Sequence, residues 1–589
     1  MAARCLGLGL CFSILLTISA PTINLWPLAA MLTVPLAVGA ALIARRAHQS
    51  LAIQQRPRIL AWAALVGVGT TPAWMWLQLF LFPVTPPGFV PLGFYLSSYS
   101  GIFVWLMARC IVARDVLRVS PPPGKLAQLA ARIPLPLLAG GLWCLLEVLR
   151  GDWVLGGYAF YNIAVPLIDI LAPLASIVGC IGCAAVVAGF GWMIGDVICN
   201  PAARPPRRLA PKLAIVAVII GLPWVLVPTL KNPGDRSLRV GVLQTNLPQS
   251  NKMSWSAASR VSDFATWQGL TRNLATANPD VIVWPETMFP GSSLSPQWTA
   301  VENRLGLYLP YADSAGIQRR LMLAELAEQL VALQAEIRIP VLIGAVGTEN
   351  PTAEKNSTRI NADSRFNSVF MIRGGKIEAD RYDKGRLVPF GEYIPIAWRL
   401  PELQNAIVGL GAKGMSFDLG FGSRPTVFII KGGPESARIA ARVVTPICFE
   451  MTYPGTMRSL VFRGDARRAD LIITPSNDGW FGWQDSGRIT HLQIARWRAA
   501  ELGTPVVRAV NTGISCVIDG AGVVLLAPGS QPLPARQEGT LVADVPLAVR
   551  STLYTHFGDW PAIATGIFSI FVLSLSGRVP RPSPSAIVS

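Results

Sequence analysis

Long apolar segments fill the first 230 residues of this 589-residue chain and return once near its end. A transmembrane helix needs about 20 mostly apolar residues. Each of the following stretches has that character, and we expect about eight transmembrane helices: 3–20, 24–43, 59–82, 88–113, 133–150, 170–195, 212–230 and 561–577. With 51% hydrophobic and 14% charged residues, the chain is too apolar for an ordinary soluble enzyme. The sequence therefore predicts a polytopic α-helical membrane domain.

The same hydropathy pattern divides the chain into three parts. We expect helices one to seven in residues 1–231, an extramembrane domain of mixed α/β sequence in 232–556, and the last helix with a cytoplasmic tail in 557–589. The first apolar segment has a second interpretation. Arg4 near its start and the small residues Ser19 and Ala20 at its end are also typical of a cleaved signal peptide.

Basic residues are concentrated in alternate loops between the expected spans. They are Arg45, Arg46, Arg56 and Arg58, then Arg114, Arg118, Lys125 and Arg132, then Arg204, Arg207, Arg208 and Lys212. The positive-inside rule places these loops in the cytoplasm and the extramembrane domain on the opposite side. It also accounts for part of the net charge of +17. We expect no nucleic-acid partner, since no zinc-finger spacing, aromatic RNP motif or basic helix accompanies that charge.

Three strand-like runs of the mixed region each end near a carboxylate, an ammonium or a thiol side chain. These side chains are Glu286 after the run 280–284, Lys384 after the hairpin 366–383, and Cys448 after the run 439–444. Ligand chemistry collects at strand ends in open α/β sheets. A carboxylate, an ammonium and a thiol there make a plausible base, oxyanion stabiliser and nucleophile. A buried structural cysteine is the other interpretation of Cys448.

Cysteine and histidine usage argues against other site chemistries. Seven cysteines lie in or beside the apolar segments, which is not a disulfide framework: Cys5, Cys11, Cys110, Cys144, Cys180, Cys183 and Cys199. Cys516 lies in a strand pattern and is expected in the core. Only His48, His491 and His556 are present, too few parts for a Cys-His protease or a His-rich metal site.

Several ordered blocks carry a family resemblance. They are Val-Pro-Phe-Gly-Glu-Tyr at 388–393, Pro-Ser-Asn-Asp-Gly-Trp-Phe-Gly at 475–482, the helical block 491–503, and Arg-Ala-Val-Asn-Thr-Gly-Ile-Ser at 508–515. With the three strand-end residues they resemble the nitrilase, or carbon-nitrogen hydrolase, superfamily. The similarity is strongest to its membrane-embedded branch, the apolipoprotein N-acyltransferases. This resemblance spans nearly the whole chain and implies a nitrilase-like α-β-β-α sandwich for the extramembrane domain.

The resemblance also implies roles for individual residues. It makes Glu286 the proton acceptor, Lys384 the oxyanion stabiliser and Cys448 the nucleophile, with Glu392 and Glu450 supporting them and Trp255, Phe449 and Asn477 as possible substrate-binding residues. Phe449 departs from the tyrosine that the family often has after the nucleophile. No metal or organic cofactor is implied.

The reaction implied is a two-step acyl transfer. A membrane phospholipid would donate a fatty acyl chain to Cys448, and the α-amino group of the N-terminal S-diacylglyceryl cysteine of a lipoprotein would accept it. The protein would be a multi-pass protein of the bacterial inner membrane, with its catalytic domain facing the periplasm and its site in contact with the bilayer. Two alternatives stay open: a membrane-tethered nitrilase-type amidase with a small soluble substrate, and a non-enzymatic transporter or receptor.

Some segments receive structural expectations only. Glu147 and Arg150 are expected as an end-of-helix pair that reaches the membrane interface. Residues 292–315 and 349–365 are expected to be mobile surface insertions, and 316–337 a helix. The Gly-rich stretch 401–421 is either ordinary packing or a lid that inserts into lipid.

Overall fold

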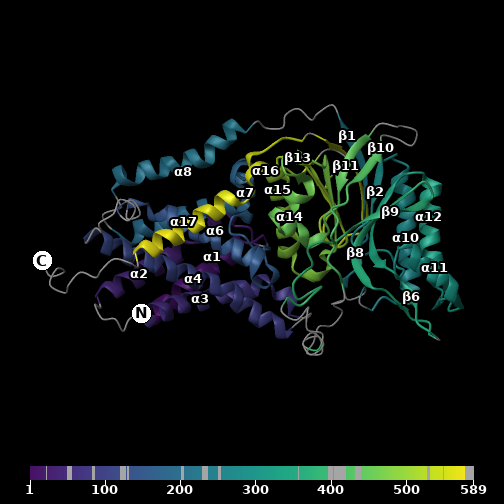
Figure 1. Ribbon diagram of the computed structural model, residues 1–589, viewed down its shortest axis with the longest axis horizontal. Coiled ribbons are helices and arrows are strands. Elements are labelled where there is room, and N and C mark those ends of the chain that lie inside the picture. Colours follow the sequence, from purple (N-terminus) through teal and green to yellow (C-terminus); the bar gives the residue numbers. More distant parts are fainter. Residues whose placement is uncertain are drawn as a thin grey trace. The chain divides into compact units, whose positions relative to one another are not determined.

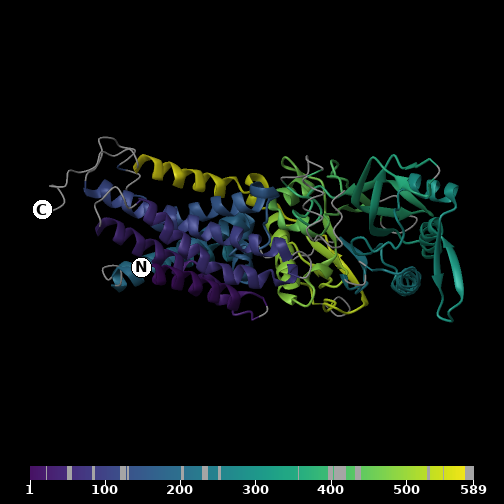
Figure 2. The same ribbon diagram turned by 90° about the horizontal axis from the view of Figure 1, so that it is seen from below.

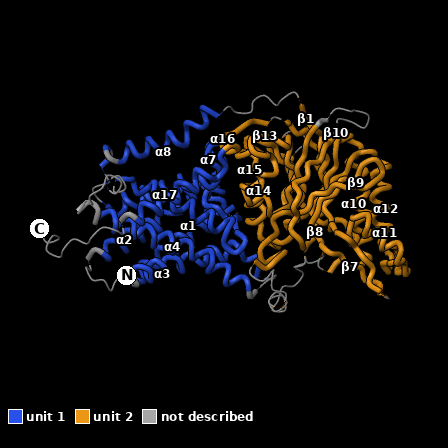
Figure 3. Tube along the Cα trace, in the orientation of Figure 1, with its two compact units in different colours: residues 1–228, 557–589 blue, residues 229–556 orange. Residues whose placement is uncertain are grey.

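The computed structural model forms two compact units, residues 1–228 with 557–589 and residues 229–556 (Figure 3). The structure describes these residues: 1–21, 23–49, 56–82, 86–119, 128, 132–200, 205–227, 236–249, 252, 254–355, 357–395, 402, 419–431, 439–526, 531–547 and 549–576. Nearly all of the stretch 401–421 lies outside them, so the expected lid stays a prediction.

Apolar helices make up the first unit (Figures 1 and 2). They are α1 (Ala2–Ser19), α2 (Val34–Gln49), α3 (Arg56–Leu77), α4 (Pro86–Val119), α6 (Leu135–Val148), α7 (Ile168–Cys199), α8 (Pro206–Leu226) and α17 (Trp560–Ser576). Of the described helical segments, six are long and apolar enough to cross a membrane. Helix α6, with 14 residues, and α17, with 17, occupy two further predicted positions but are shorter, so eight crossings stay a prediction.

Small residues let helices of this unit approach closely. A Cβ atom on Gly9 of α1 would lie 2.2 Å from the carbonyl oxygen of Val66 in α3. Ser13 in α1 donates a hydrogen bond of 2.9 Å to the carbonyl of Gly69. Transmembrane helices associate through such small-residue contacts and interhelical hydrogen bonds, because lipid is as apolar as the helices themselves.

Glu147 and Arg150 lie inside the first unit, so the expectation that they reach the interface is wrong. Their exposed fractions are 7% and 3%. The Arg150 guanidinium donates to the Glu147 carboxylate and, over 2.6 Å, to the carbonyl of Tyr161. The indole N–H of Trp143 donates to the other Glu147 oxygen over 3.0 Å. Packing around the end of α6 thus buries the pair.

Two sheets form the centre of the second unit. The first runs in the order β17-β1-β2-β5-β8-β9 and the second in the order β10-β11-β14-β15-β16. Their bounds are β1 (Ser237–Gln244), β2 (Val281–Val283), β5 (Val341–Glu349), β8 (Ser364–Arg373), β9 (Lys376–Asp383), β17 (Gly539–Pro546), β10 (Phe428–Lys431), β11 (Ile439–Val444), β14 (Leu471–Ser476), β15 (Val506–Val510) and β16 (Cys516–Ile518). Strand β1 contacts β15 and β11 of the other sheet, so the sheets pack against each other.

Helices cover the outer faces of both sheets. Figure 1 shows α10 (Ala257–Ala275) and α12 (Leu323–Ile337) on one side and α14 (Pro454–Val461) and α15 (Asp485–Leu502) on the other. Trp267 of α10 and Leu330 of α12 share one buried apolar cluster with Trp284, which follows β2. This is the expected α-β-β-α sandwich, and the fold class is confirmed.

One sequence expectation near residue 320 needs correction. Residues 292–315, expected to be a mobile surface insertion, hold α11 (Pro296–Leu305) and strand β3 (Tyr308–Ala312). The predicted helix 316–337 begins only at Leu323, since Gln318–Met322 forms strand β4 and pairs antiparallel with β3. Strand β4 is stabilised by pairing with β3, and the local sequence pattern alone does not reveal that pairing. The second expected insertion carries a short pair, β6 (Thr352–Ala353) and β7 (Ile360–Asn361).

The ends of parallel strands in the two sheets come together. Strands β1, β2 and β5 run parallel in one sheet, and β11, β14 and β15 run parallel in the other. Asn511, just after β15, bonds across the gap to the loop that follows β1: Thr245 Oγ1 and the Leu247 N–H donate to its side-chain oxygen over 2.8 and 2.7 Å. The exit loops of both sheets therefore border one region.

Candidate active site

The three predicted strand-end residues meet at this region. Glu286 follows β2, Lys384 follows β9 and Cys448 follows β11. Lys384 Nζ lies 3.4 Å from Glu286 Oε1, and the Cys448 thiol interacts electrostatically with both charges. A glycine makes part of this approach possible: a Cβ atom on Gly344 of β5 would lie 2.6 Å from the Glu286 Cα.

Glu286 is a buried carboxylate surrounded by donors. Its Oε1 accepts from the Asn367 amide over 2.6 Å, and its Oε2 accepts from the backbone N–H of Asn477 over 2.8 Å. Burial alone would raise its pKa, but Lys384, Asn367, Lys252 and the Asn477 N–H together hold the pKa below its ordinary value. The group is therefore ionised at neutral pH and able to accept a proton.

Lys384 is an ammonium held between two carboxylates. It is 1% exposed and donates to Glu392 Oε1 over 2.9 Å, in addition to its contact with Glu286. Burial would lower its pKa, but Glu392, Glu286 and the Cys448 sulfur outweigh that effect and raise it. Lys384 is thus a fixed positive charge and not a proton donor at neutral pH.

Cys448 lies on a strained turn. It opens the 3₁₀ helix η8 (Cys448–Thr452) with φ of +50°, a conformation that costs a non-glycine residue energy and is often found at functional sites. Burial and the charge of Glu286 raise the pKa of the thiol, against the opposite effect of Lys384. The resting sulfur is therefore a neutral thiol, and a base must remove its proton during attack.

Glu450 and Glu392, predicted as supporting residues, hold the loops that carry Lys384 and Cys448. Glu450 is fully buried and accepts from the N–H groups of Ile447, Gly385 and Arg386 over 2.8, 2.8 and 3.0 Å. It also accepts from the hydroxyl of Tyr382 over 2.9 Å. One carboxylate thereby links the loop after β9 to the turn at Cys448.

Of the three predicted substrate-binding residues, Asn477 donates a hydrogen bond to a triad side chain. Its N–H donates to Glu286, and its side chain bonds to Gln249 and Asn511 over 3.0 and 2.9 Å. Phe449 is 8% exposed and stacks edge-on against Tyr453 with ring centroids 5.5 Å apart.

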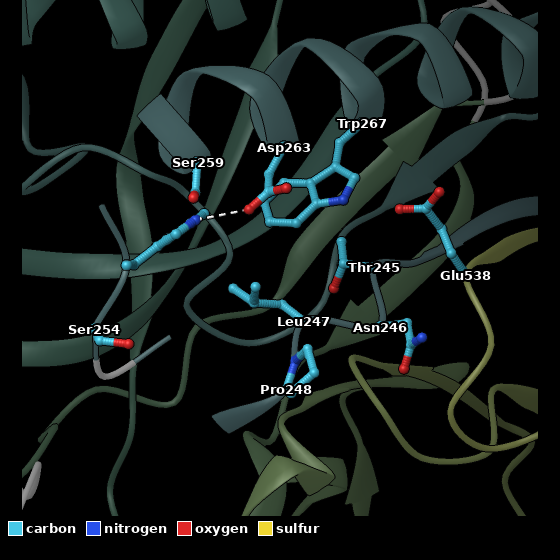
Figure 4. A pocket seen from close by; sticks show the side chains of 10 residues that line it. Thr245, Asn246, Leu247, Pro248, Ser254, Ser259, Asp263, Trp267 and Glu538 are labelled. Atoms are coloured by element: carbon cyan, nitrogen blue, oxygen red, sulfur yellow. Dashed lines mark hydrogen bonds between the residues drawn. The ribbon is translucent and has the colours of Figure 1, made fainter. Parts of the chain in front are cut away.

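Trp255 is one of the residues that line a second region of this unit, the pocket beside Asp263 and Trp267 in Figure 4. The pocket has a volume of about 520 Å³, and the described residues around it are Thr245, Asn246, Leu247, Pro248, Ser254, Trp255, Ser259, Asp263, Trp267 and Glu538. The indole N–H of Trp255 donates to Asp263 over 2.8 Å, and its ring lies 5.8 Å from that of Trp267. The triad residues are not among this lining, so the substrate-binding role of Trp255 stays a prediction.

Two residues of the site escaped the sequence analysis. Asn367, in the middle of β8, donates to both Glu286 and Glu392; the signal was a polar residue inside an apolar strand. Lys252 donates to the hydroxyl of Thr287, next to Glu286, and interacts electrostatically with Glu286 and Cys448. Burial lowers the pKa of Lys252 to about 8, although both neighbours oppose that effect. Its position in the loop after the first parallel strand could have identified it.

The arrangement supports covalent chemistry. A thiol, an ionised carboxylate and a fixed ammonium in one buried cluster can supply a nucleophile, its base and an oxyanion stabiliser. Within the described ranges, no group of three or more His, Cys, Asp or Glu side chains is placed to hold a metal ion.

Comparisons with known proteins agree with this fold. The carbon-nitrogen hydrolase model matches residues 239–553, and the model of the apolipoprotein N-acyltransferase N-terminal domain matches residues 12–193. The apolipoprotein N-acyltransferase of Shewanella oneidensis is 28% identical over 433 residues, 72% of this chain and 71% of its own. That of Geobacter metallireducens is 27% identical over 492 residues, 80% and 77% of the two chains.

A solved amidase of the nitrilase superfamily from Nesterenkonia is also similar. It is 15% identical, covers 53% of this chain and 92% of its own, and has a TM-score of 0.33.

Proposed function

Because the chain belongs to the carbon-nitrogen hydrolase family, in its apolipoprotein N-acyltransferase branch, we propose that it acylates lipoproteins through a thioester on Cys448. The donor is a membrane phospholipid. The acceptor is the α-amino group of an N-terminal S-diacylglyceryl cysteine. The observation that carries this proposal is the cluster of buried Glu286 and Lys384 with the partly exposed Cys448, whose thiol lies on a strained turn.

In the first step the Cys448 sulfur attacks an ester carbonyl of the phospholipid. Glu286 takes the thiol proton as the S–C bond forms, which is required because the pKa of the thiol is raised. Lys384 and a backbone N–H at the turn stabilise the tetrahedral oxyanion. The ester C–O bond then breaks, and the lysophospholipid alcohol leaves with the proton from Glu286.

In the second step the neutral α-amine attacks the thioester carbonyl. The same donors stabilise the second oxyanion, the C–S bond breaks, and an amide forms. The proton lost by the amine passes through Glu286 to the Cys448 sulfur, which restores the thiol. Exclusion of water by lipid around the thioester favours the amine over hydrolysis.

The protein is a multi-pass bacterial membrane protein, and we place its catalytic unit on the periplasmic side of the inner membrane. The alternation of basic loops along the first 230 residues supports that orientation. The domain assignment 1–231, 232–556 and 557–589 is part of the same proposal. The amidase alternative is not favoured by the relatives, and a transporter or receptor has no need of a thiol on a strained turn.

Mass spectrometry of the intact protein tests the proposal. After incubation with phospholipid vesicles, wild-type protein should gain the mass of one acyl chain on Cys448, and Cys448→Ala should gain none. Cys11→Ala, which removes an exposed thiol on α1, is the matched control and should acylate normally. Wild-type protein that stays unmodified while it hydrolyses small amides would establish the amidase instead.

A further inference from the structure

His491 connects the turn at Cys448 to a buried cluster of charged side chains, Asp478 and Arg508, that has no role in the steps proposed above. It lies on α15 and is 1% exposed. Its Nδ1 is 2.9 Å from Asp478 Oδ1, and its Nε2 is 3.2 Å from the backbone carbonyl oxygen of Cys448. One ring thus bridges a carboxylate and the nucleophile residue itself.

Asp478 is held in its ionised form. Arg508 donates to its Oδ2 over 3.3 Å, and the hydroxyl of Ser476 donates to its Oδ1 over 2.9 Å. Burial would raise the pKa of Asp478, but His491, Arg508 and Ser476 hold it below the ordinary value. Arg488, on the same helix as His491, adds a further positive charge that interacts with Asp478.

Both partners of the His491 ring are therefore acceptors. An ionised carboxylate and a peptide carbonyl have no proton to offer, whereas a neutral imidazole has one donor and one acceptor nitrogen. Two hydrogen bonds to two acceptors need a proton on each ring nitrogen. The geometry thus fits an imidazolium, whose charge Asp478 compensates.

The carbonyl that His491 contacts belongs to the peptide bond between Cys448 and Phe449. This peptide is planar, and the described chain holds no cis peptide bond. In a trans peptide the C=O and N–H groups point in opposite directions, so fixing the Cys448 carbonyl also fixes the Phe449 N–H. At nucleophile turns the N–H of the residue after the nucleophile faces the developing oxyanion.

We propose that His491, doubly protonated, is a positioning residue that holds the Cys448–Phe449 peptide plane so that the Phe449 N–H is aimed at the oxyanion. This inference rests on the acyl-transfer chemistry proposed above. The Glu450 backbone N–H donates over 3.1 Å to the Ile447 carbonyl, in the peptide before the nucleophile, and His491 contacts the carbonyl of the peptide after it. The two peptides lie on either side of a residue with positive φ.

The protonation state can be measured without any acyl transfer. The chain has three histidines, so the variant His48→Gln/His556→Gln leaves His491 as the one imidazole. His556 lies at the surface beside Asp465. In ¹⁵N-histidine-labelled protein in detergent at neutral pH, both ring nitrogens of His491 should have shifts of protonated nitrogen. One protonated and one unprotonated nitrogen would overturn the proposal.

The positioning role needs a second readout. In His491→Leu the acylation rate of Cys448 by an activated soluble ester should fall by about 10²- to 10³-fold, the cost of a lost oxyanion donor. Alkylation of Cys448 by iodoacetamide, which forms no oxyanion, should fall at least tenfold less. His491→Gln, whose amide can still donate to the carbonyl, should recover part of the acylation.

The two readouts separate the possible outcomes. Equal losses of acylation and alkylation in His491→Gln, or no loss in a folded His491→Leu, would overturn the positioning role. If His491→Leu does not fold, the His491→Gln comparison and the labelled histidine decide. A wild-type protein that reacts with the soluble ester but takes no acyl chain from phospholipid would refute the proposed donor and leave the role of His491 intact.

Discussion

Each unit of the molecule brings a buried glutamate, a buried cation and a cysteine close together, but the two groups are built differently. In the first unit Glu147 pairs with Arg150 beside Cys144, whose thiol donates to the carbonyl of Ile181 from a regular helix. In the second unit Glu286 and Lys384 flank Cys448, which is partly exposed on a turn with positive φ. Residue types alone therefore do not make a reactive site; backbone setting and access to the sulfur do.

The charge balance differs as well. Arg150 and Glu147 pair with each other, and Trp143 and the Tyr161 carbonyl add hydrogen bonds, while Arg150 Nη1 has no hydrogen-bond partner among the described residues. In the second cluster the cations Lys252 and Lys384 lie near the carboxylates Glu286 and Glu392. This arrangement keeps Glu286 ionised and Lys384 protonated beside the Cys448 thiol. Competition between several charges is typical of catalytic sites, although structural ion pairs also perturb protonation.

The largest expected effect separates the two cysteines. Cys448→Ala should lower the acyl-transfer rate by about 10⁴- to 10⁶-fold, as for loss of a nucleophile elsewhere. Cys144→Ala should leave the rate within a few-fold of wild type, because that thiol lies in a regular helix. Rates are measured with phospholipid and a diacylglyceryl lipopeptide. Comparable losses in both variants would contradict the distinction between Cys448 and Cys144.

Glu286→Gln tests the base. The amide keeps the size of the side chain but cannot accept the thiol proton, so acylation should slow by about 10²- to 10⁴-fold. Single-turnover acylation followed by mass spectrometry measures the step directly. Thermal unfolding of the same variant is the control, and a normal acylation rate would exclude Glu286 as the proton acceptor.

Arg150→Met tests the structural pair. It leaves the Glu147 carboxylate buried without its cation, which costs about 3–5 kcal/mol of stability in comparable cases. The double variant Glu147→Leu/Arg150→Met should recover most of that loss, because no uncompensated charge remains. Thermal unfolding in detergent measures stability, and the acyl-transfer rate per folded molecule should stay near wild type. A large rate loss in the folded double variant would show that the pair has a catalytic role.

Lys252 should give the smallest effect, visible mainly in pH dependence. With its pKa lowered from 10.5 to about 8 by burial, folded protein loses this proton as pH rises through 8. Acylation should decline there as a positive charge near Glu286 and Cys448 disappears. Lys252→Arg, which stays charged, should lack that decline. If the variant has the same pH–rate profile as wild type, Lys252 is not the group responsible.

The lowered pKa of Lys252 also makes the free energy of unfolding depend on pH. Between pH 8 and 10.5 the unfolded chain binds more protons at Lys252 than the folded one, so this residue makes stability rise with pH across that window. Lys252→Met should flatten the rise. Unfolding midpoints at several pH values measure it.

The sequence predicted the parts of the site that lie at strand ends, because two apolar runs and the hairpin 366–383 indicate where β2, β11 and β9 end. It missed Asn367, whose amide matters only because β8 lies beside β5 and β9. Burial of Glu147 depends on Trp143 on α6 and on Arg150, which reaches the chain at Tyr161. Strand β4 depends on pairing with β3. In each case the structure depends on a residue or strand that is not part of the local sequence pattern.

The acceptor step tests the central claim most directly. Protein carrying an acyl chain on Cys448 is purified, mixed with a synthetic diacylglyceryl lipopeptide, and both molecules are weighed by mass spectrometry over time. The account predicts that the acyl mass leaves Cys448 and appears on the lipopeptide α-amine in equal amount. Release of the chain as free fatty acid, with the lipopeptide unchanged, would contradict it.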